Sequence, residues 1–351
     1  MLRAFRDELR YILRHKEYLA LLTLLPLLSL LFFYLFFRNT AIEKLPIVVV
    51  DNDKSITSSK VVEMINATAS ISVAYSALDT TDAEQLIRTG KAYAAVIIPH
   101  NFEHNILRQQ PCEVVLYNNG TNISTNGFIE KDIQIVITTF GAAVSLKTGQ
   151  GIAQILPVSI EQHVLFNSTL DYAAYLAPCF MPMMIMIFTI LGSVMATAER
   201  KQKSIKTLIG RALPTTASMA IFALIMLIIL FRLLEIPLNG SIWIILAATA
   251  LLIIDYQAIA ITLSLLTNNR HLAMSLGGGY AVLAFTFSGL TFPTMAMMPV
   301  LQFLSHLFPF TYYMRIMVEQ ALRGAPVAIS LTSLGYMTLF ILVPILIHKR
   351  L

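Results

Sequence analysis

The chemistry that this sequence could carry begins with one acid inside an apolar segment. Asp255 lies within residues 242–266, a stretch long enough to cross a bilayer. A carboxylate in such a place is costly, and it is a candidate for a functional role by default. A structural role would instead give it a hydrogen bond to Tyr256, Gln257 or a neighbouring helix. With no evident basic partner, Asp255 makes a poor proton relay.

A second group of acids follows an apolar run in the polar region of residues 38–171. Asp51 and Asp53 flank Asn52 there. Paired carboxylates can bind a divalent cation, but such residues more often end a strand and start a turn. We favour the turn and expect no metal site.

Nucleotide chemistry is not indicated in this chain. The sequence contains no G-x-x-x-x-G-K-[ST] loop, and the run Gly277-Gly278-Gly279 opens an apolar segment without a following Lys-Ser/Thr. Three small residues there favour close helix packing. No Ser-His-Asp or Cys-His arrangement can be argued from spacing. We therefore expect no catalytic residue, and any power source must be another chain or an ion gradient.

Composition places the chain in a membrane. Of its 351 residues, 56% are hydrophobic and 13% are charged, whereas a soluble domain carries about 25% charged residues. The net charge of +5 does not indicate nucleic acid binding, because the basic residues cluster beside apolar segments. The expected fold is a polytopic α-helical membrane protein with six transmembrane helices. The expected helices are residues 20–37, 172–198, 216–234, 242–266, 272–292 and 327–347.

An extracytoplasmic α/β domain is expected between the first two of these helices. Short apolar runs alternate there with amphipathic stretches, as in small α/β domains. A long helix over 125–155 and a returning strand over 159–166 complete this region. The expected organisation is an amphipathic helix at 1–18, a span at 19–37, the α/β domain at 38–171, and a five-helix membrane domain at 172–351 with a loop at 199–214 and re-entrant helices at 293–326.

The orientation follows from the basic residues. They concentrate in the N-terminal segment, in the loop at 199–214 and at the C-terminus, and short basic loops stay in the cytoplasm. Both termini are therefore expected inside and the α/β domain outside. The loop also carries an apolar stripe at helical spacing, formed by Ile205, Leu208 and Ile209. Such a stripe can lie on anionic lipid or enter a groove of a cytoplasmic partner.

The segment FSGLTFPTMAMMPVLQFLSHLFPFTYYMRIMVEQALRG, residues 287–324, resembles the C-terminal signature of type-2 ABC exporter permeases. The loop at 199–214 stands where that family has its coupling helix, and the large domain with the phrase PIVVVDNDKS resembles the subgroup of bacterial inner membranes. One departure concerns the loop. The family usually continues Glu-Arg with Glu, Gly-Thr and another Glu, whereas Lys201, Ser204, Ile205 and Lys206 stand here.

The resemblance implies the permease subunit of an ATP-driven exporter that moves an amphipathic or hydrophobic substrate outward. Two permease chains would pair, and separate ABC ATPase subunits would bind ATP and Mg and dock below them. A periplasmic adaptor is a further expected partner. The residues expected to couple to the ATPase are Glu199, Arg200, Lys203, Ile205, Leu208 and Ile209. The residues expected along the pathway are Met181, Met184, Tyr280, Phe287 and Asp255. The competing interpretation is a membrane-anchored receptor or scaffold whose outer domain binds a ligand without transport.

Overall fold

The structure is a computed structural model that describes residues 1–38, 44–108, 110, 112–119, 123–148, 172–198, 204–267, 269–290 and 292–348. It divides into two compact units. Unit 1 comprises Met1–Thr40 and Leu165–Leu351, and unit 2 comprises Ala41–Val164. The expected strand over 159–166 lies outside the described residues.

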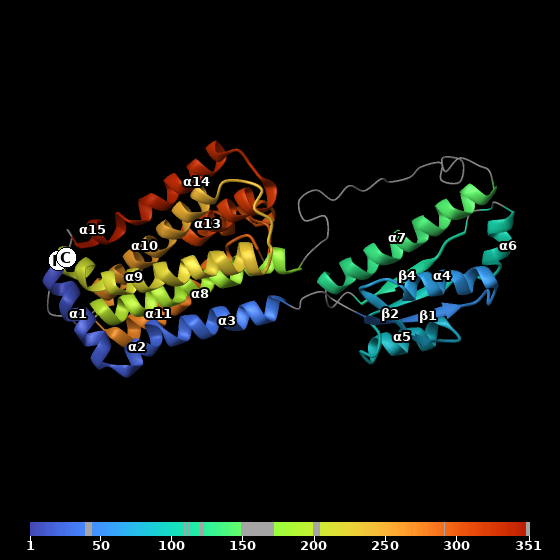
Figure 1. Cartoon of the computed structure of the whole chain (residues 1–351), viewed down its shortest axis with the longest axis horizontal. Helices are drawn as coiled ribbons and strands as arrows, with labels where there is room; N and C mark the ends of the chain where they lie inside the picture. The colour runs from blue at the N-terminus through green and yellow to red at the C-terminus, as the bar shows by residue number, and fades with distance from the viewer. Residues whose placement is uncertain are drawn as a thin grey trace. The chain divides into compact units, whose positions relative to one another are not determined.

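Unit 2 is an α/β fold with helices on both faces of a four-stranded sheet (Figure 1). The strand order is β2-β1-β3-β4, in which β4 alone is antiparallel to its neighbour. Its elements are β1 (Leu45–Asp51), α4 (Ile56–Asn66), β2 (Ile71–Ser76), α5 (Thr80–Arg88), β3 (Ala94–Ile98), α6 (Phe102–Leu107), β4 (Val115–Asn118) and α7 (Ile123–Thr148). The strand and helix alternation expected from the sequence over residues 45–117 is present.

The central strand β1 explains why this sheet needs helices on both sides. Ile47 and Val49 pack in the core under α4 and α7, while Val48 and Val50 pack in a second core under α5. Successive side chains of a strand point to opposite faces. A strand that is apolar at every position must therefore be covered twice, which the unbroken run of valines predicts.

The acids after β1 build a turn, as the sequence predicts. The Asp51 carboxylate accepts hydrogen bonds from the backbone N–H groups of Asp53 and Lys54, each at 3.0 Å. The Asp53 carboxylate accepts from the N–H of Glu103 in the first turn of α6, also at 3.0 Å. Burial raises the pKa of Asp53, but hydrogen bonds from the Ser55 side chain and from three backbone N–H groups outweigh it, and the net pKa is lowered.

Unit 1 is a helical bundle. Its helices are α1 (Leu2–Arg14), α2 (Lys16–Leu22), α3 (Leu24–Arg38), α8 (Tyr172–Thr197), α9 (Ile205–Ile228), α10 (Ile242–Thr267), α11 (Arg270–Thr286), α12 (Pro299–Ser305), α13 (Pro309–Met317), α14 (Val327–Phe340) and α15 (Val343–His348). Two π-helical turns, η2 (Ile229–Leu233) and η4 (Val318–Arg323), extend α9 and α13, and a short 3-10 turn, η3 (Thr294–Ala296), precedes α12. Helix α8 packs against α3, α9, α10 and α11 at the centre.

Five helical segments among the described residues are long and apolar enough to cross a membrane. They are Lys16–Arg38, Tyr172–Thr197, Ile205–Leu233, Ile242–Thr267 and Val327–Ile347. The segment expected as a sixth span, residues 272–292, forms α11, which has 17 residues and ends at Thr286. At about 1.5 Å per residue such a helix reaches about 26 Å, short of a typical bilayer core. A sixth crossing remains a prediction.

The first span is broken near Pro26. Proline has no N–H, so it cannot bond to the carbonyl four residues earlier, that of Leu22. Helix α2 ends at Leu22 and α3 begins at Leu24. The hydroxyl of Ser218 on α9 donates to the Leu22 carbonyl at 2.5 Å. The carbonyl left free at the break thus forms a specific hydrogen bond between the first span and α9.

The re-entrant region expected at 293–326 consists of short helices in the structure. Pro299 and Pro309 occupy the first turns of α12 and α13, where a missing N–H costs no helical bond. Helix α13 is buried along almost its whole length, and Arg315 is its one exposed residue. It packs against α10, α11 and α14. Protein therefore covers this short helix, as the prediction of re-entrant helices requires.

We expect the Asp53→Ala substitution to destabilise unit 2 by about 1 kcal/mol at neutral pH, because α6 loses a side-chain acceptor at its N-terminus. A lowered native pKa stabilises the fold at pH values above the unfolded pKa, and this contribution is lost as the pH falls through the native pKa. The difference from wild type should therefore be full above about pH 4 and vanish in stronger acid. Urea unfolding of residues 41–164 at several pH values measures it.

The control is Glu84→Gln, which breaks an exposed pair with Arg88 on α5 and should cost about 0–1 kcal/mol. Equal stability of Asp53→Ala and wild type at pH 7 would contradict the capping role.

Candidate functional site

The segment expected to couple to a partner begins a membrane helix. The sequence suggests a loop over 199–214 ahead of a span that starts at 216, but α9 runs without interruption from Ile205 to Ile228. Pro214 lies inside it. The stretch from Ile205 onward is therefore the end of a long helix, which corrects the expected loop boundary. Glu199, Arg200 and Lys203 lie outside the described residues.

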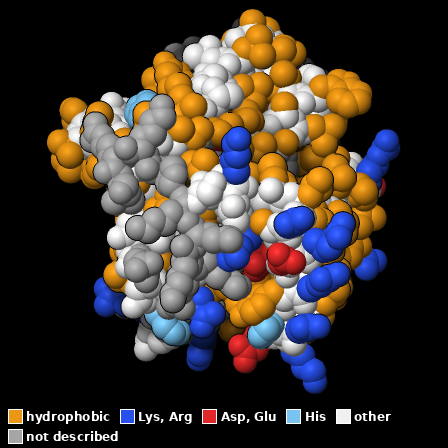
Figure 2. Space-filling model, turned by 90° about the vertical axis from the view of Figure 1, so that its left-hand side faces the viewer, with side chains coloured by type: hydrophobic (Ala, Val, Ile, Leu, Met, Phe, Trp, Pro, Cys, Tyr) orange, Lys and Arg blue, Asp and Glu red, His pale blue; other side chains and the backbone are white. Residues whose placement is uncertain are grey.

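Helix α1 packs on this end of α9. A Cβ added at Gly210 would come within 2.8 Å of the backbone oxygen of Met1 and 3.3 Å of the Ala4 side chain, so glycine is what permits the approach. On α1 itself, Glu8 and Ile12 are buried. Arginine side chains of α1 are exposed, and Figure 2 shows Lys and Arg gathered on the face of unit 1 that carries this helix. The two helices together form a basic platform, defined here as α1 with Ser204 and residues 205–212 of α9.

The apolar stripe of Ile205, Leu208 and Ile209 does not form one exposed face. Leu208 is only 2% exposed and packs with Ala212 and with Ile261 of α10. Ile209 is 37% exposed, and Ile205 is half-buried. The expectation that Leu208 enters a partner's groove is therefore revised, because this side chain already packs against α10 within the chain. Ile209 is the residue of the stripe that a partner can reach.

Asp255 is fully buried in α10 at 0% exposure. Neither of its carboxylate oxygens has a hydrogen-bond partner among the described residues. The bonds to Tyr256 or Gln257 that a structural role would need are not formed. Gln257 instead accepts a hydrogen bond from the Thr216 hydroxyl of α9 at 2.8 Å. This carboxyl is therefore a buried polar group that its own fold leaves unpaired.

A series of aromatic ring contacts begins at Tyr256, the residue that follows this acid on α10. The rings of Tyr256 and Tyr280 meet edge to face at 6.1 Å between centroids, and Tyr280 lies 5.0 Å from Phe308. Phe308 in turn stacks on Phe287 at 5.9 Å. Of the residues expected along a pathway, Tyr280 and Phe287 are thus linked through Phe308, and Asp255 is the chain neighbour of Tyr256. The sequence analysis did not single out Tyr256 or Phe308 as pathway residues.

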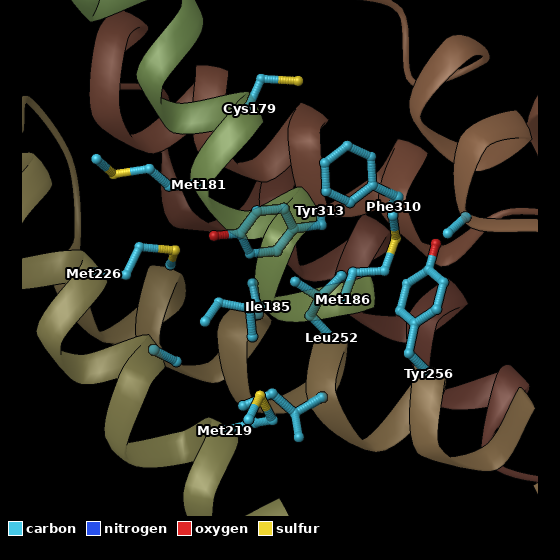
Figure 3. Close-up of a cluster of buried hydrophobic side chains, with 14 of the residues drawn as sticks. Cys179, Met181, Ile185, Met186, Met219, Met226, Leu252, Tyr256, Phe310 and Tyr313 are labelled. Atoms are coloured by element: carbon cyan, nitrogen blue, oxygen red, sulfur yellow. The ribbon is translucent and has the colours of Figure 1, made fainter. Parts of the chain in front are cut away.

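The methionines expected along the pathway, Met181 and Met184, lie on α8. Met181 is fully buried in the core of unit 1 and lies near Ile185, Met226 and Tyr313 (Figure 3). Met184, three residues further along α8, is only half-buried. A Met in this core fills space between helices. Met181 shares the buried core of unit 1 with Tyr256 and Phe308.

A polar network around η4 was also missed. Ser330 of α14 donates to the Glu319 carboxylate at 2.6 Å, and the Gln320 side chain donates to Ser330 at 2.9 Å. The same Gln320 accepts from the N–H of Ser241 at 2.9 Å, which ties the start of α10 to this turn. Gly324 then closes η4 with a φ of +61°, in the region that favours glycine. The glycine of the Arg-Gly that ends the signature segment is thus explained by the backbone conformation at the end of η4.

A family model of the ABC-2 family transporter protein matches residues 16–347 of the chain. The chain belongs to this family. No curated protein and no solved structure was found to match it. Membership makes the chain a transmembrane permease subunit of an ABC transporter, and it implies an ABC ATPase as partner. The type-2 ABC permease that the sequence suggests is confirmed at the level of the family.

We expect the Gly210→Val substitution to loosen α1 from α9. The new side chain meets the Met1 backbone, which cannot turn aside as a flexible side chain would. Overpacking of this kind costs about 1–3 kcal/mol. Limited trypsin digestion in micelles should cut faster at the arginines of α1. The control is Gly278→Val in α11, where an added Cβ meets nothing within 4 Å. Equal digestion of both variants would contradict the close approach.

Proposed function

We propose that this chain is the permease subunit of an ATP-driven exporter that moves an amphipathic or hydrophobic substrate out of the cytoplasm or the inner leaflet. Family membership supports the permease role and the ATPase partner. The outward direction is supported by the large α/β unit between the first two membrane helices, which the sequence associates with exporters of bacterial inner membranes. ATP and Mg bind to the partner, and this chain supplies the pathway.

The observation that carries the proposal is the basic platform of α1 and α9. Its exposed basic side chains and the exposed Ile209 lie at the end of a membrane helix that continues past Pro214. A partner that binds there acts directly on a membrane-spanning helix. We infer that the ATPase docks on this platform and that its motion reaches the bundle through α9.

The proposed setting is a bacterial inner membrane with both termini in the cytoplasm and unit 2 in the periplasm. The asymmetry of basic residues supports this orientation. Two permease chains pair in the proposed complex, and a periplasmic adaptor that binds unit 2 is a further proposed partner.

The orientation has a direct test. A fluorescent protein fused after Lys349 should be bright, because it folds in the cytoplasm, and alkaline phosphatase at the same position should be inactive. A phosphatase inserted in unit 2, between α6 and β4, should be active. The reverse pattern at the C-terminus would refute the proposed topology.

We expect Ile209→Asp to reduce copurification of the ATPase with tagged permease at least about fivefold, because a charge enters a contact that is dry in the complex. Substrate-stimulated ATP hydrolysis should fall with it. The permease itself should still insert and fold, since Ile209 is partly exposed in the chain alone.

Two variants separate docking from folding. Ile56→Asp places the same charge at an 86% exposed isoleucine of unit 2 and should leave copurification unchanged. Leu208→Ala removes packing against Ile261. It should lower the free energy of unfolding of the permease itself by about 2–4 kcal/mol. If Ile209→Asp retains wild-type copurification and hydrolysis, this end of α9 does not contact the ATPase.

The second candidate is a receptor or scaffold whose unit 2 binds a ligand without transport. Its one supporting observation is that unit 2 has cores of its own, independent of the bundle. Reconstituted permease and ATPase distinguish the two, because an exporter accumulates substrate across the membrane only with ATP.

A further inference from the structure

The unpaired carboxyl of Asp255 and the rings beside it form one candidate binding site, named here the Asp255 site. It comprises Asp255, Tyr256, Tyr280, Phe308 and Phe287. Asp255 directly precedes Tyr256 on α10, and the Tyr256 ring meets the Tyr280 ring of α11. The ring contacts then continue to Phe308 and Phe287, close to the end of α11 at Thr286.

Within the part of the chain that the structure describes, the acid has no counter-charge. Among the described residues, no hydrogen bond reaches either carboxylate oxygen, and no basic side chain forms an ion pair with Asp255. An isolated carboxylate in an apolar bundle costs much free energy unless a cation or several donors meet it. Other buried polar atoms of the bundle also lack a partner among the described residues, such as the hydroxyls of Tyr256 and Tyr313, but Asp255 is the acid there whose two carboxylate oxygens both lack one. A cation supplied by a ligand would meet that need.

The aromatic rings indicate the chemistry of a ligand that could bind beside the acid. An aromatic face attracts a cation, and an aromatic edge and face together bind apolar surface. The Tyr280 hydroxyl donates to the Leu307 carbonyl at 2.8 Å, which fixes this ring between Tyr256 and Phe308. A ligand with one positive charge and aromatic or aliphatic bulk would satisfy the acid and the rings at once. A neutral or anionic ligand of the same size would satisfy only the rings.

We propose that the Asp255 site recognises the positive charge of the transported substrate, so that the substrate class is amphipathic cations. This inference rests on the proposed export function and narrows its substrate. Because Asp255 is 0% exposed in the present conformation, the substrate reaches it in another state of the transport cycle. The present conformation is then one in which the site is closed.

The test uses two ions of equal size and opposite charge, tetraphenylphosphonium and tetraphenylborate. Each is titrated against the purified permease–ATPase complex in nanodiscs of neutral lipid, with empty nanodiscs as the background. Wild type should bind the phosphonium more tightly than the borate. Asp255→Asn should weaken phosphonium binding at least about tenfold, because truncating one partner of a buried charge contact is expensive, and it should leave borate binding unchanged.

Further variants separate recognition from folding. Asp255→Glu keeps the charge and should recover most of the phosphonium binding. Phe308→Leu keeps apolar volume without a ring and should weaken it about threefold to tenfold. Asp82→Asn, the same change at an exposed position on α5, is the matched control and should have no effect. Each variant must copurify with the ATPase at wild-type levels, which shows that it is folded.

Two results would overturn the proposal: equal phosphonium binding by wild type and a folded Asp255→Asn complex, or no preference of wild type for phosphonium over borate. Asp255 would then be a structural carboxyl. Failure of the export function looks different, because it appears in the wild-type complex as absent ATPase copurification or absent ATP-driven transport. In that case the same titrations on the permease alone still decide whether Asp255 binds a cation.

Discussion

The bundle depends on one constraint, which is that a polar group away from water must find a hydrogen-bond partner. Hydroxyls inside α8 and α10 return to carbonyls four residues earlier, as Thr189 and Thr249 do. Tyr18 of α2 donates to the Gly192 carbonyl of α8 at 2.9 Å, and Ser218 reaches the carbonyl that Pro26 leaves free. Contacts that a helical wheel would assign to apolar packing are therefore fixed by single hydrogen bonds with one correct geometry.

Against that background Asp255 stands out by its chemistry, because an acid is more costly to bury than a hydroxyl or an amide. The amide oxygen of Gln257, two residues further on, accepts a hydrogen bond from α9, whereas neither oxygen of the acid has a partner among the described residues. A protein tolerates such a group when function requires it and the rest of the fold holds it in place. The packed core around Met181 and Tyr313 provides that support.

The sequence predicts much of the fold because its signals are local. Valine runs with turn residues between them identify the strands of unit 2, and long apolar runs identify most of the membrane helices. It fails where the decisive contact is distant. Spacing alone placed Leu208 beside Ile209 on one stripe, but Ile261 on another helix decides that Leu208 is inside. Likewise, the length of α11 is set by where its chain turns at Ser288, and hydropathy continues past that point.

The uninterrupted course of α9 has a mechanical consequence. A helix transmits displacement along its axis with little loss, because each peptide is braced by bonds to the turns on either side. From Ile205 to Ile228 the helix is about 36 Å long, given a rise of about 1.5 Å per residue, and can act as a stiff lever. Pro214 removes one helical hydrogen bond within this length and is a point where the helix can bend. The helix continues on both sides of it, so a small tilt imposed at one end moves the other end through a larger arc. A second point of bending is the π turn at Ile229–Leu233, where hydrogen bonding is locally rearranged.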